Sequence, residues 1–250
     1  MPVRRERVDP IRTPDGTLLV HRRWILPDDL ARPIAPAALA RLWRGLRELD
    51  VLDPSAEVAL EKRALPLAPA AESVRLDLPA AASAGALLAT AGEAALLTQV
   101  VWIDRDDGRR DPYGEDEDGV RGFRDYTLYS VGAGQEGYLL LPLVPLSLSC
   151  GACGHASDPA LPRFGEAALL DLSRPCPGCK AALDPGRDKV RLRSGAVFLL
   201  EEACARAALS IELPAAPEEE ELPDAAVAGL LQEAFGGYDE LADDLTAAAK

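Results

Sequence analysis

Apolar side chains recur along this chain at two spacings, one typical of helices and the other of strands. We expect a helix from Pro36 to Leu52, with the proline in its first turn, and further helices over Ser55–Arg63 and Ala196–Leu209. The apolar positions of the first helix lie mostly three or four residues apart and are Leu39, Leu42, Trp43, Leu46 and Leu49.

Other stretches alternate or are rich in β-branched and aromatic residues, which favours strands. A turn at Pro14–Gly16 indicates an N-terminal hairpin, and after this turn Thr17–Val20 leads into Trp24–Leu26. Glu166–Leu172 fits a short helix or a strand. The remaining strands are expected at Ser73–Leu78, Leu96–Ile103, Phe123–Val131, Tyr138–Leu146 and Val190–Arg193.

A glycine-rich stretch, Gly132–Gly137, matches the Gly-x-Gly-x-x-Gly pattern of dinucleotide-binding loops. That site requires a helix directly after the glycines, whose N-terminus holds the pyrophosphate. Here Pro142 and Pro145 follow within nine residues and are incompatible with such a helix. We therefore expect a hairpin turn between two antiparallel strands and no nucleotide site.

Four cysteines form the strongest chemical pattern in the chain. Two Cys-x-x-Cys pairs, Cys150–Cys153 and Cys176–Cys179, are separated by 22 residues and lie in glycine- and proline-containing turns. Thiolates at this spacing can occupy the four corners of one tetrahedral Zn²⁺ site. Disulfides, free core thiols and a redox pair are the alternatives, and His155 is close enough to replace one ligand. Cys204 lies in an apolar run and is expected in the core.

The stretch from Ser147 to Arg193 resembles a zinc ribbon, in which two knuckles clamp one metal ion between short strands. The usual knuckle is Cys-x-x-Cys-Gly. The first pair keeps this glycine as Gly154, whereas the second has Lys180. Because a strand runs into Cys150, we expect the first knuckle to extend a strand of the main sheet. With four cysteine ligands no coordination position stays open, so the resemblance implies one structural Zn²⁺ per chain.

Composition narrows the possible functions. The formal net charge of −14 argues against broad binding to nucleic-acid phosphates, and no apolar run is long enough to span a membrane. The N-terminus has no apolar run typical of a secretion signal, so a reducing cytoplasmic location is expected. The two histidines lie far apart in sequence, and no recognised catalytic motif is present. We therefore favour a protein that is not an enzyme.

The C-terminal segment is strongly acidic. From Glu212 to Lys250 there are eleven acids and one lysine, a local charge of −10. Pro214–Pro223 is expected to be a solvated linker, Ala225–Phe235 a helix, and Tyr238–Ala249 a second short amphipathic helix. Such a tail can dock on a partner or pack on its own domain. Its candidate partner-binding residues are Leu230, Leu231, Phe235 and Leu241.

Together these patterns predict an α+β protein: an antiparallel sheet with a few helices, an inserted zinc ribbon and an acidic helical tail. We expect an N-terminal domain at 1–146, the ribbon and a following helix at 147–211, and the acidic part at 212–250. The predicted function is a zinc-stabilised module that binds another protein. The cysteine pattern is also similar to bacterial double-CxxCG proteins, which implies an immunity-type protein that neutralises a toxin. A nucleic-acid-associated ribbon factor, using the ribbon's arginines and lysines, is the other alternative.

Overall fold

The computed structural model describes residues 20–30, 34–49, 52, 58–65, 72–76, 89–103, 122–142, 145–158, 161–192, 195–213 and 225–245. In these ranges the chain is an α+β protein in which antiparallel sheets dominate and three helices are present. None of the described helices is both long and apolar enough to cross a membrane. The predicted N-terminal turn and the acidic linker at 214–223 lie outside the described residues.

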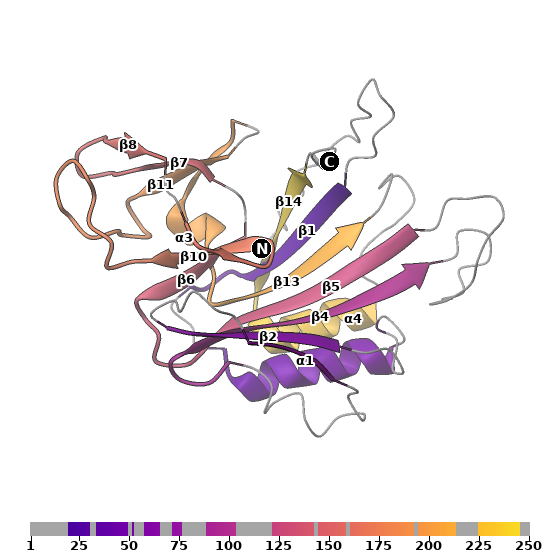
Figure 1. The fold of residues 1–250 in the computed structure, drawn as a ribbon. Helices are drawn as coiled ribbons and strands as arrows, with labels where there is room; N and C mark the ends of the chain where they lie inside the picture. Colours follow the sequence, from indigo (N-terminus) through magenta and orange to yellow (C-terminus); the bar gives the residue numbers. More distant parts are fainter. Residues whose placement is uncertain are drawn as a thin grey trace.

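A seven-stranded sheet forms the centre of the fold (Figure 1). Its order is β14-β1-β13-β5-β4-β2-β3, and each neighbouring pair is antiparallel. The strands are β1 (Val20–Pro27), β2 (Val58–Ala64), β3 (Glu72–Leu76), β4 (Glu93–Ile103), β5 (Gly122–Val131), β13 (Ala207–Leu213) and β14 (Tyr238–Leu245).

Two helices cover one face of this sheet. Helix α1 (Pro36–Glu48) begins at a proline, and its apolar stripe is buried, as the helical spacing predicts. Helix α4 (Ala225–Phe235) lies beside it, with Leu230 against Gly45. Both pack on sheet side chains such as Leu97 and Leu128 and form the first core cluster. In Figure 1 the two helices run next to each other below the sheet.

The opposite face carries the segment that contains the cysteines, here called the cysteine lobe (the described residues from Tyr138 to Ala205). It holds a three-stranded sheet, β6-β10-β9, and a four-stranded sheet, β12-β11-β7-β8 (Figure 1). Its elements are β6 (Tyr138–Leu141), β7 (Pro145–Ser149), β8 (Ala156–Ser157), β9 (Arg163–Phe164), β10 (Ala167–Asp171), β11 (Lys189–Leu192), β12 (Val197–Leu199) and helix α3 (Leu200–Ala203).

The cysteine lobe and the large sheet share a second core cluster. The ring of Tyr129 lies between those of Trp24, also from the sheet, and Phe164 from the lobe. Its centroid is 5.3 Å from that of Trp24 and 6.0 Å from that of Phe164. A buried arginine also links the sheet to the lobe. The side chain of Arg22 is only 5% exposed and forms an ion pair of 3.1 Å with Glu166. The Tyr129 hydroxyl accepts the Glu166 N–H at 3.2 Å. The lobe is therefore seated by both apolar and polar contacts.

Several sequence predictions are confirmed, among them the helix beginning at Pro36 and the strands at β3, β4, β5 and β11. The strand predicted at Tyr138–Leu146 is instead divided between β6 and β7, which lie in different sheets. Three predicted helices are wrong. The stretch Ser55–Arg63, predicted as a helix, contains most of β2, where Val58 and Leu60 are buried at the two-residue spacing of a strand. The stretch Ala196–Leu209 contains β12, the one-turn helix α3 and the start of β13. The segment Tyr238–Ala249 contains β14, an edge strand paired with β1.

Two predicted connections are also corrected. Gly132–Gly137 joins β5 to β6, which lie in different sheets, so it is not a hairpin turn; no helix follows it, as the prolines predict. Strand β7, which runs into Cys150, belongs to the four-stranded sheet rather than the large one. The large sheet takes strands from 1–146, 147–211 and 212–250 alike. The three-domain division stays a prediction.

Candidate metal centre

The first cysteine pair lies in a tight turn at the end of β7. The Cys150 N–H donates to the His155 carbonyl at 2.9 Å, and the Gly154 N–H donates to the Cys150 carbonyl at 2.7 Å. Gly154 has φ of +73°, a left-handed conformation that glycine adopts without steric cost. The backbone therefore curls back on itself and presents both thiols on one side of the turn.

The second cysteine pair repeats this turn. The Cys176 N–H donates to the Ala181 carbonyl at 2.7 Å, and the Lys180 N–H donates to the Cys176 carbonyl at 2.9 Å. Lys180 is the counterpart of Gly154 and, with φ of +64°, the one described non-glycine residue with a positive φ. The substitution of lysine for the usual glycine thus leaves the backbone of the knuckle unchanged, at the steric cost that an L-residue incurs in this region.

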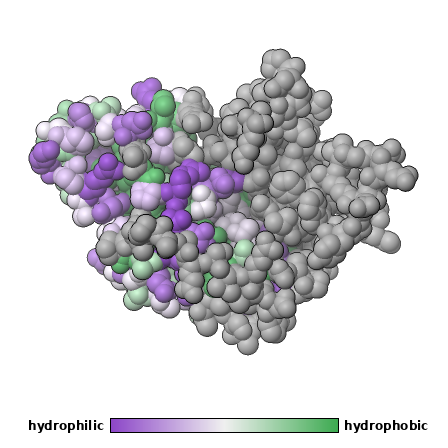
Figure 2. Space-filling model, in the orientation of Figure 1, coloured by the Kyte–Doolittle hydropathy of each residue, from purple (hydrophilic) through white to green (hydrophobic). Residues whose placement is uncertain are grey.

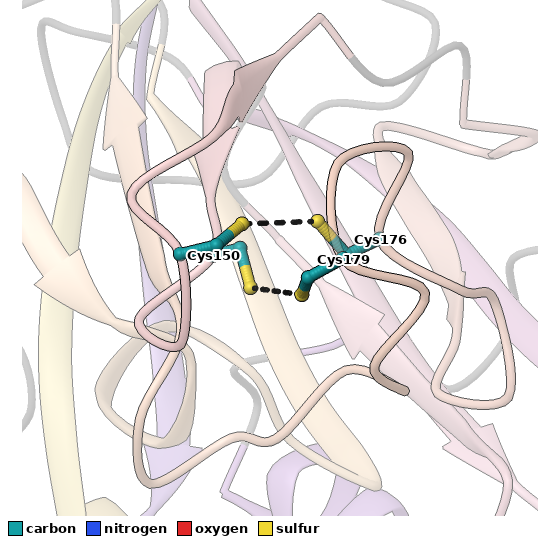
Figure 3. Close-up of side chains that lie close together, drawn as sticks. Cys150, Cys176 and Cys179 are labelled. Atoms are coloured by element: carbon teal, nitrogen blue, oxygen red, sulfur yellow. Dashed lines mark hydrogen bonds between the residues drawn. The ribbon is translucent and has the colours of Figure 1, made fainter.

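The two turns bring the four thiols together (Figure 3). The Cys150 and Cys179 sulfurs are 3.7 Å apart, and so are those of Cys153 and Cys176. All four sulfurs lie within 4.8 Å of one another. None of the five cysteines is in a disulfide, so the disulfide alternative does not describe this structure.

These distances fit one tetrahedral metal ion. A Zn–S bond of about 2.3 Å places tetrahedral sulfurs about 3.8 Å apart, because the edge of a tetrahedron is about 1.63 times its radius. The observed 3.7 Å across each of the two cross-knuckle pairs matches this separation. The four cysteines could therefore hold one metal ion, and their donor set suits Zn²⁺ or iron.

The electrostatics of the thiols also favour a cation. The Cys179 N–H donates to the Cys176 thiol and, against the opposing effect of burial, lowers its pKa to about 7, with help from the Gly178 N–H. At Cys153 the His155 N–H lowers the pKa, but burial and the neighbouring thiols outweigh it and raise the pKa to about 12. Negative charges this close repel one another. A divalent cation at their centre allows all four to be thiolates.

The site is built at the surface of the cysteine lobe. Cys150 and Cys176 are buried, whereas Cys153 and Cys179 are exposed. His155 is exposed and is not part of the four-residue cluster; its backbone rather than its ring supports the first knuckle. With four sulfur donors a bound metal has no open position for a substrate, so it would supply structure rather than Lewis-acid chemistry.

Sequence reasoning missed an acidic residue beside the knuckles. The Asp188 side chain is 2% exposed and accepts the Gly151 N–H at 2.8 Å, the Asp184 N–H at 3.0 Å and the Arg187 Nε–H at 3.0 Å. Burial raises the pKa of Asp188, but the hydrogen bonds from Arg187, Asp184 and Gly151 outweigh it and hold the pKa below its usual range. No spacing rule distinguishes this residue among the 41 acids of the chain.

The candidate partner-binding residues lie apart from the cysteines and largely inside the protein. Leu231 and Phe235 have no exposed surface and belong to the first core cluster, and Leu230 is partly buried against it. Leu241, on β14, packs against the second core cluster. The described part of the C-terminal segment, residues 225–245, thus packs on its own domain. Cys204 is buried as expected, and burial raises the pKa of its thiol.

A comparison with known proteins finds no matching family model, no matching curated protein and no matching solved structure.

Proposed function

We propose that this protein is a zinc-stabilised module that binds another protein and is not an enzyme. The observation that carries the proposal is the four-cysteine cluster, whose sulfur separations match a closed tetrahedral site. It is the one cluster of three or more potential metal-ligating side chains among the described residues. We propose further that the two knuckles, with the paired strands β7 and β11, form a zinc ribbon.

The charge distribution supports a basic protein partner. Between Pro145 and Leu192 six basic and five acidic residues nearly balance, so the net charge of −14 resides elsewhere in the chain. In the described C-terminal part, β14 carries four acids in eight residues and forms one edge of the large sheet. An acidic edge strand attracts basic partners and can pair with their backbone. Because Leu231 and Phe235 are buried, recognition would use this polar edge rather than the apolar face of α4.

The surface of the lobe is better interpreted as a solvated surface than as a nucleic-acid-binding site. Figure 2 shows hydrophilic residues gathered on the cysteine lobe and at its junction with the large sheet. Arg187 forms an ion pair with Asp188, and Arg163 forms one with Glu166. A surface of nearly balanced charge gives little counterion release on nucleic acid.

The first test is metal content. Elemental analysis of the purified protein should give one zinc per chain, and thiol counting should show four thiols that become reactive only after chelation. Iron in place of zinc would favour electron transfer and argue against the proposal. A protein that binds no metal and contains disulfides would overturn it.

The second test concerns the partner. Immobilised protein should retain a stoichiometric partner from its native host at low salt and release it as ionic strength rises. An Asp239→Lys variant on the exposed edge should lose this partner, whereas Glu202→Lys in the lobe should keep it. Absence of any stoichiometric protein would count against the module, and salt-dependent binding of the pure protein to DNA or RNA would favour the ribbon factor instead.

A further inference from the structure

The first knuckle is held by the rest of the lobe, whereas the second is held mainly by itself. The hydrogen bonds described for the second knuckle run within residues 175–182, except for one in which Arg187 donates to the Ala182 carbonyl at 3.1 Å. In contrast, the Gly151 N–H of the first knuckle donates to the carboxylate of Asp188, 37 residues further along the chain. This contact fixes the residue that directly follows Cys150 and so fixes the direction in which the knuckle leaves β7.

The fit around Gly151 is close. A Cβ at this position would collide with the Arg187 carbonyl oxygen, so the turn that contains Asp188 presses directly on the knuckle. The oxygen that accepts from Gly151, Oδ1, also accepts the Arg187 Nε–H, and the other oxygen of the carboxylate, Oδ2, accepts the Asp184 N–H. With its lone pairs occupied by three donors, Asp188 has a fixed position and can in turn fix Gly151.

Asp188 is also tied to the element that leads back to the large sheet. Its carbonyl accepts the Leu200 N–H at 2.9 Å, and Leu200 begins α3. After this helix, Ala205 exchanges two backbone hydrogen bonds with Leu140, and β13 follows at Ala207. One buried residue thus joins the first knuckle to the chain that enters the middle of the large sheet.

We propose that Asp188 is the positioning residue of the metal centre: it orients the Cys150–Cys153 knuckle toward the metal and slows metal release. This inference rests on the proposed function, because it requires metal bound by the four cysteines. Asp188 donates nothing to the metal itself. It acts through the Gly151 amide, as residues behind metal ligands commonly do.

The test uses the full-length, zinc-loaded protein and the variant Asp188→Asn. Transfer of zinc to a chromophoric chelator should become about 10- to 100-fold faster, the range found when a residue behind a metal ligand is removed. Asp184→Asn is the matched control, because its exposed carboxylate accepts from Gly186 and does not touch Gly151. It should release zinc at nearly the parental rate, since exposed pairs contribute little.

Mass spectrometry of alkylated thiols separates positioning from general destabilisation. In Asp188→Asn, Cys150 and Cys153 should be alkylated before Cys176 and Cys179, because the first knuckle contacts the Asp188 carboxylate directly through Gly151. If all four react together, or if zinc transfer keeps the parental rate, the inference is overturned. Should the asparagine variant fail to fold, Asp188→Glu, which keeps the charge but displaces it, should show the same order of alkylation.

The parental protein distinguishes the two levels of failure. If it binds one zinc per chain and Asp188→Asn behaves like it, the positioning role alone is wrong. If the parental protein binds no metal, the proposed function fails and the role of Asp188 fails with it.

Discussion

The two faces of the seven-stranded sheet are covered in different ways. On one face, α1 and α4 present continuous apolar stripes, and residues such as Trp43, Leu46 and Phe235 are buried against the sheet. On the other face lies the cysteine lobe, whose strands are two to five residues long and whose single described helix has four. Elements this short bury little apolar surface each, although together they contribute buried residues such as Leu140 and Leu169 to the second core cluster.

The restraints on the lobe side are a four-cysteine cluster, the buried acid Asp188, and the contacts of Arg22 and Tyr129 with Glu166. Each is polar and depends on geometry, and each acts in addition to the apolar area that the lobe buries in the second core cluster. The comparison teaches that one half of this fold follows from hydrophobic pattern, and the other from buried apolar residues combined with a small number of specific contacts. We therefore expect the two faces to respond separately to damage.

Metal removal should have the largest effect and should be confined at first to the lobe. Structural zinc contributes on the order of 10 kcal/mol of apparent folding energy in small zinc domains. Chelation, Cys150→Ser or Cys176→Ser should unfold the two knuckles and lower the melting temperature of the chain. Hydrogen exchange should show β7 and β11 losing protection while α1 stays protected.

A control removes a thiol that is outside the cluster. Cys204→Ala should keep the metal, and its melting temperature should change far less than that of the ligand variants, because Cys204 lies apart from the four sulfurs. If Cys150→Ser and Cys176→Ser both melt like the parent, the lobe does not depend on metal and the contrast between the faces is lost. Simultaneous loss of protection in α1 and β11 would show that the faces form one cooperative unit.

The sequence anticipates the helical face better than the lobe for a physical reason. The apolar stripe of α1 is a local signal, repeated every three or four residues, and it predicts both the helix and its buried side. The cysteine signal is also local, because each Cys-x-x-Cys spacing by itself indicates a pair of thiols that can bind one metal ion. The α+β class and the four-cysteine cluster are accordingly predictable from the chain alone.

Long-range pairing is what the sequence does not reveal. Leu241 and Leu245 lie four residues apart and favour a helix, but β14 pairs along its full length with β1, more than 200 residues earlier in the chain. That pairing supplies hydrogen bonds that local spacing cannot indicate. Asp188 is hidden for the same reason, because its significance comes from Gly151, which is far away in sequence.

Damage to the helical face should lower stability without releasing metal. Phe235→Ala removes a fully buried ring from the first core cluster and should cost about 3–5 kcal/mol in the free energy of unfolding. Denaturant unfolding measures the loss, and elemental analysis should still find one metal per chain. Glu233→Ala on the same helix is the control, since its ion pair with Arg41 is exposed and contributes less than about 1 kcal/mol. Metal loss in Phe235→Ala would mean that the two faces are coupled.

The contact between the large sheet and the cysteine lobe should weaken at alkaline pH. Burial raises the pKa of Tyr129 to about 12, although its hydrogen bond from Glu166 acts in the opposite direction. An unfolded tyrosine ionises near 10, so the folded state binds this proton more tightly and loses stability as the pH rises from about 10 to 12. The two-unit difference corresponds to about 3 kcal/mol at the upper end.

Chemical denaturation across this pH range measures the effect, with Tyr129→Phe as the comparison. The phenylalanine variant has no proton to lose, so its stability should fall less steeply between pH 10 and 12. At neutral pH it should be about 1 kcal/mol less stable, because the Glu166 N–H loses its acceptor. Parallel pH profiles for the two proteins would show that Tyr129 does not control the alkaline transition.

The smallest expected effect distinguishes the knuckles within the lobe, and it is a gain. Lys180 adopts the left-handed conformation that glycine occupies at the equivalent Gly154. Lys180→Gly should relieve this backbone cost, offset in part by the greater freedom of glycine in the unfolded chain, and stabilise the holo-protein by about 0.5–1 kcal/mol. Lys180→Ala removes the same charge and the hydrogen bond to Pro177 but keeps a Cβ, so it should bring no such gain. Equal melting temperatures for the glycine and alanine variants would show that the backbone conformation at this position carries no strain. A higher melting temperature for the glycine variant alone would show that the second knuckle forms despite its sequence. The metal and its four sulfurs would then outweigh one unfavourable residue.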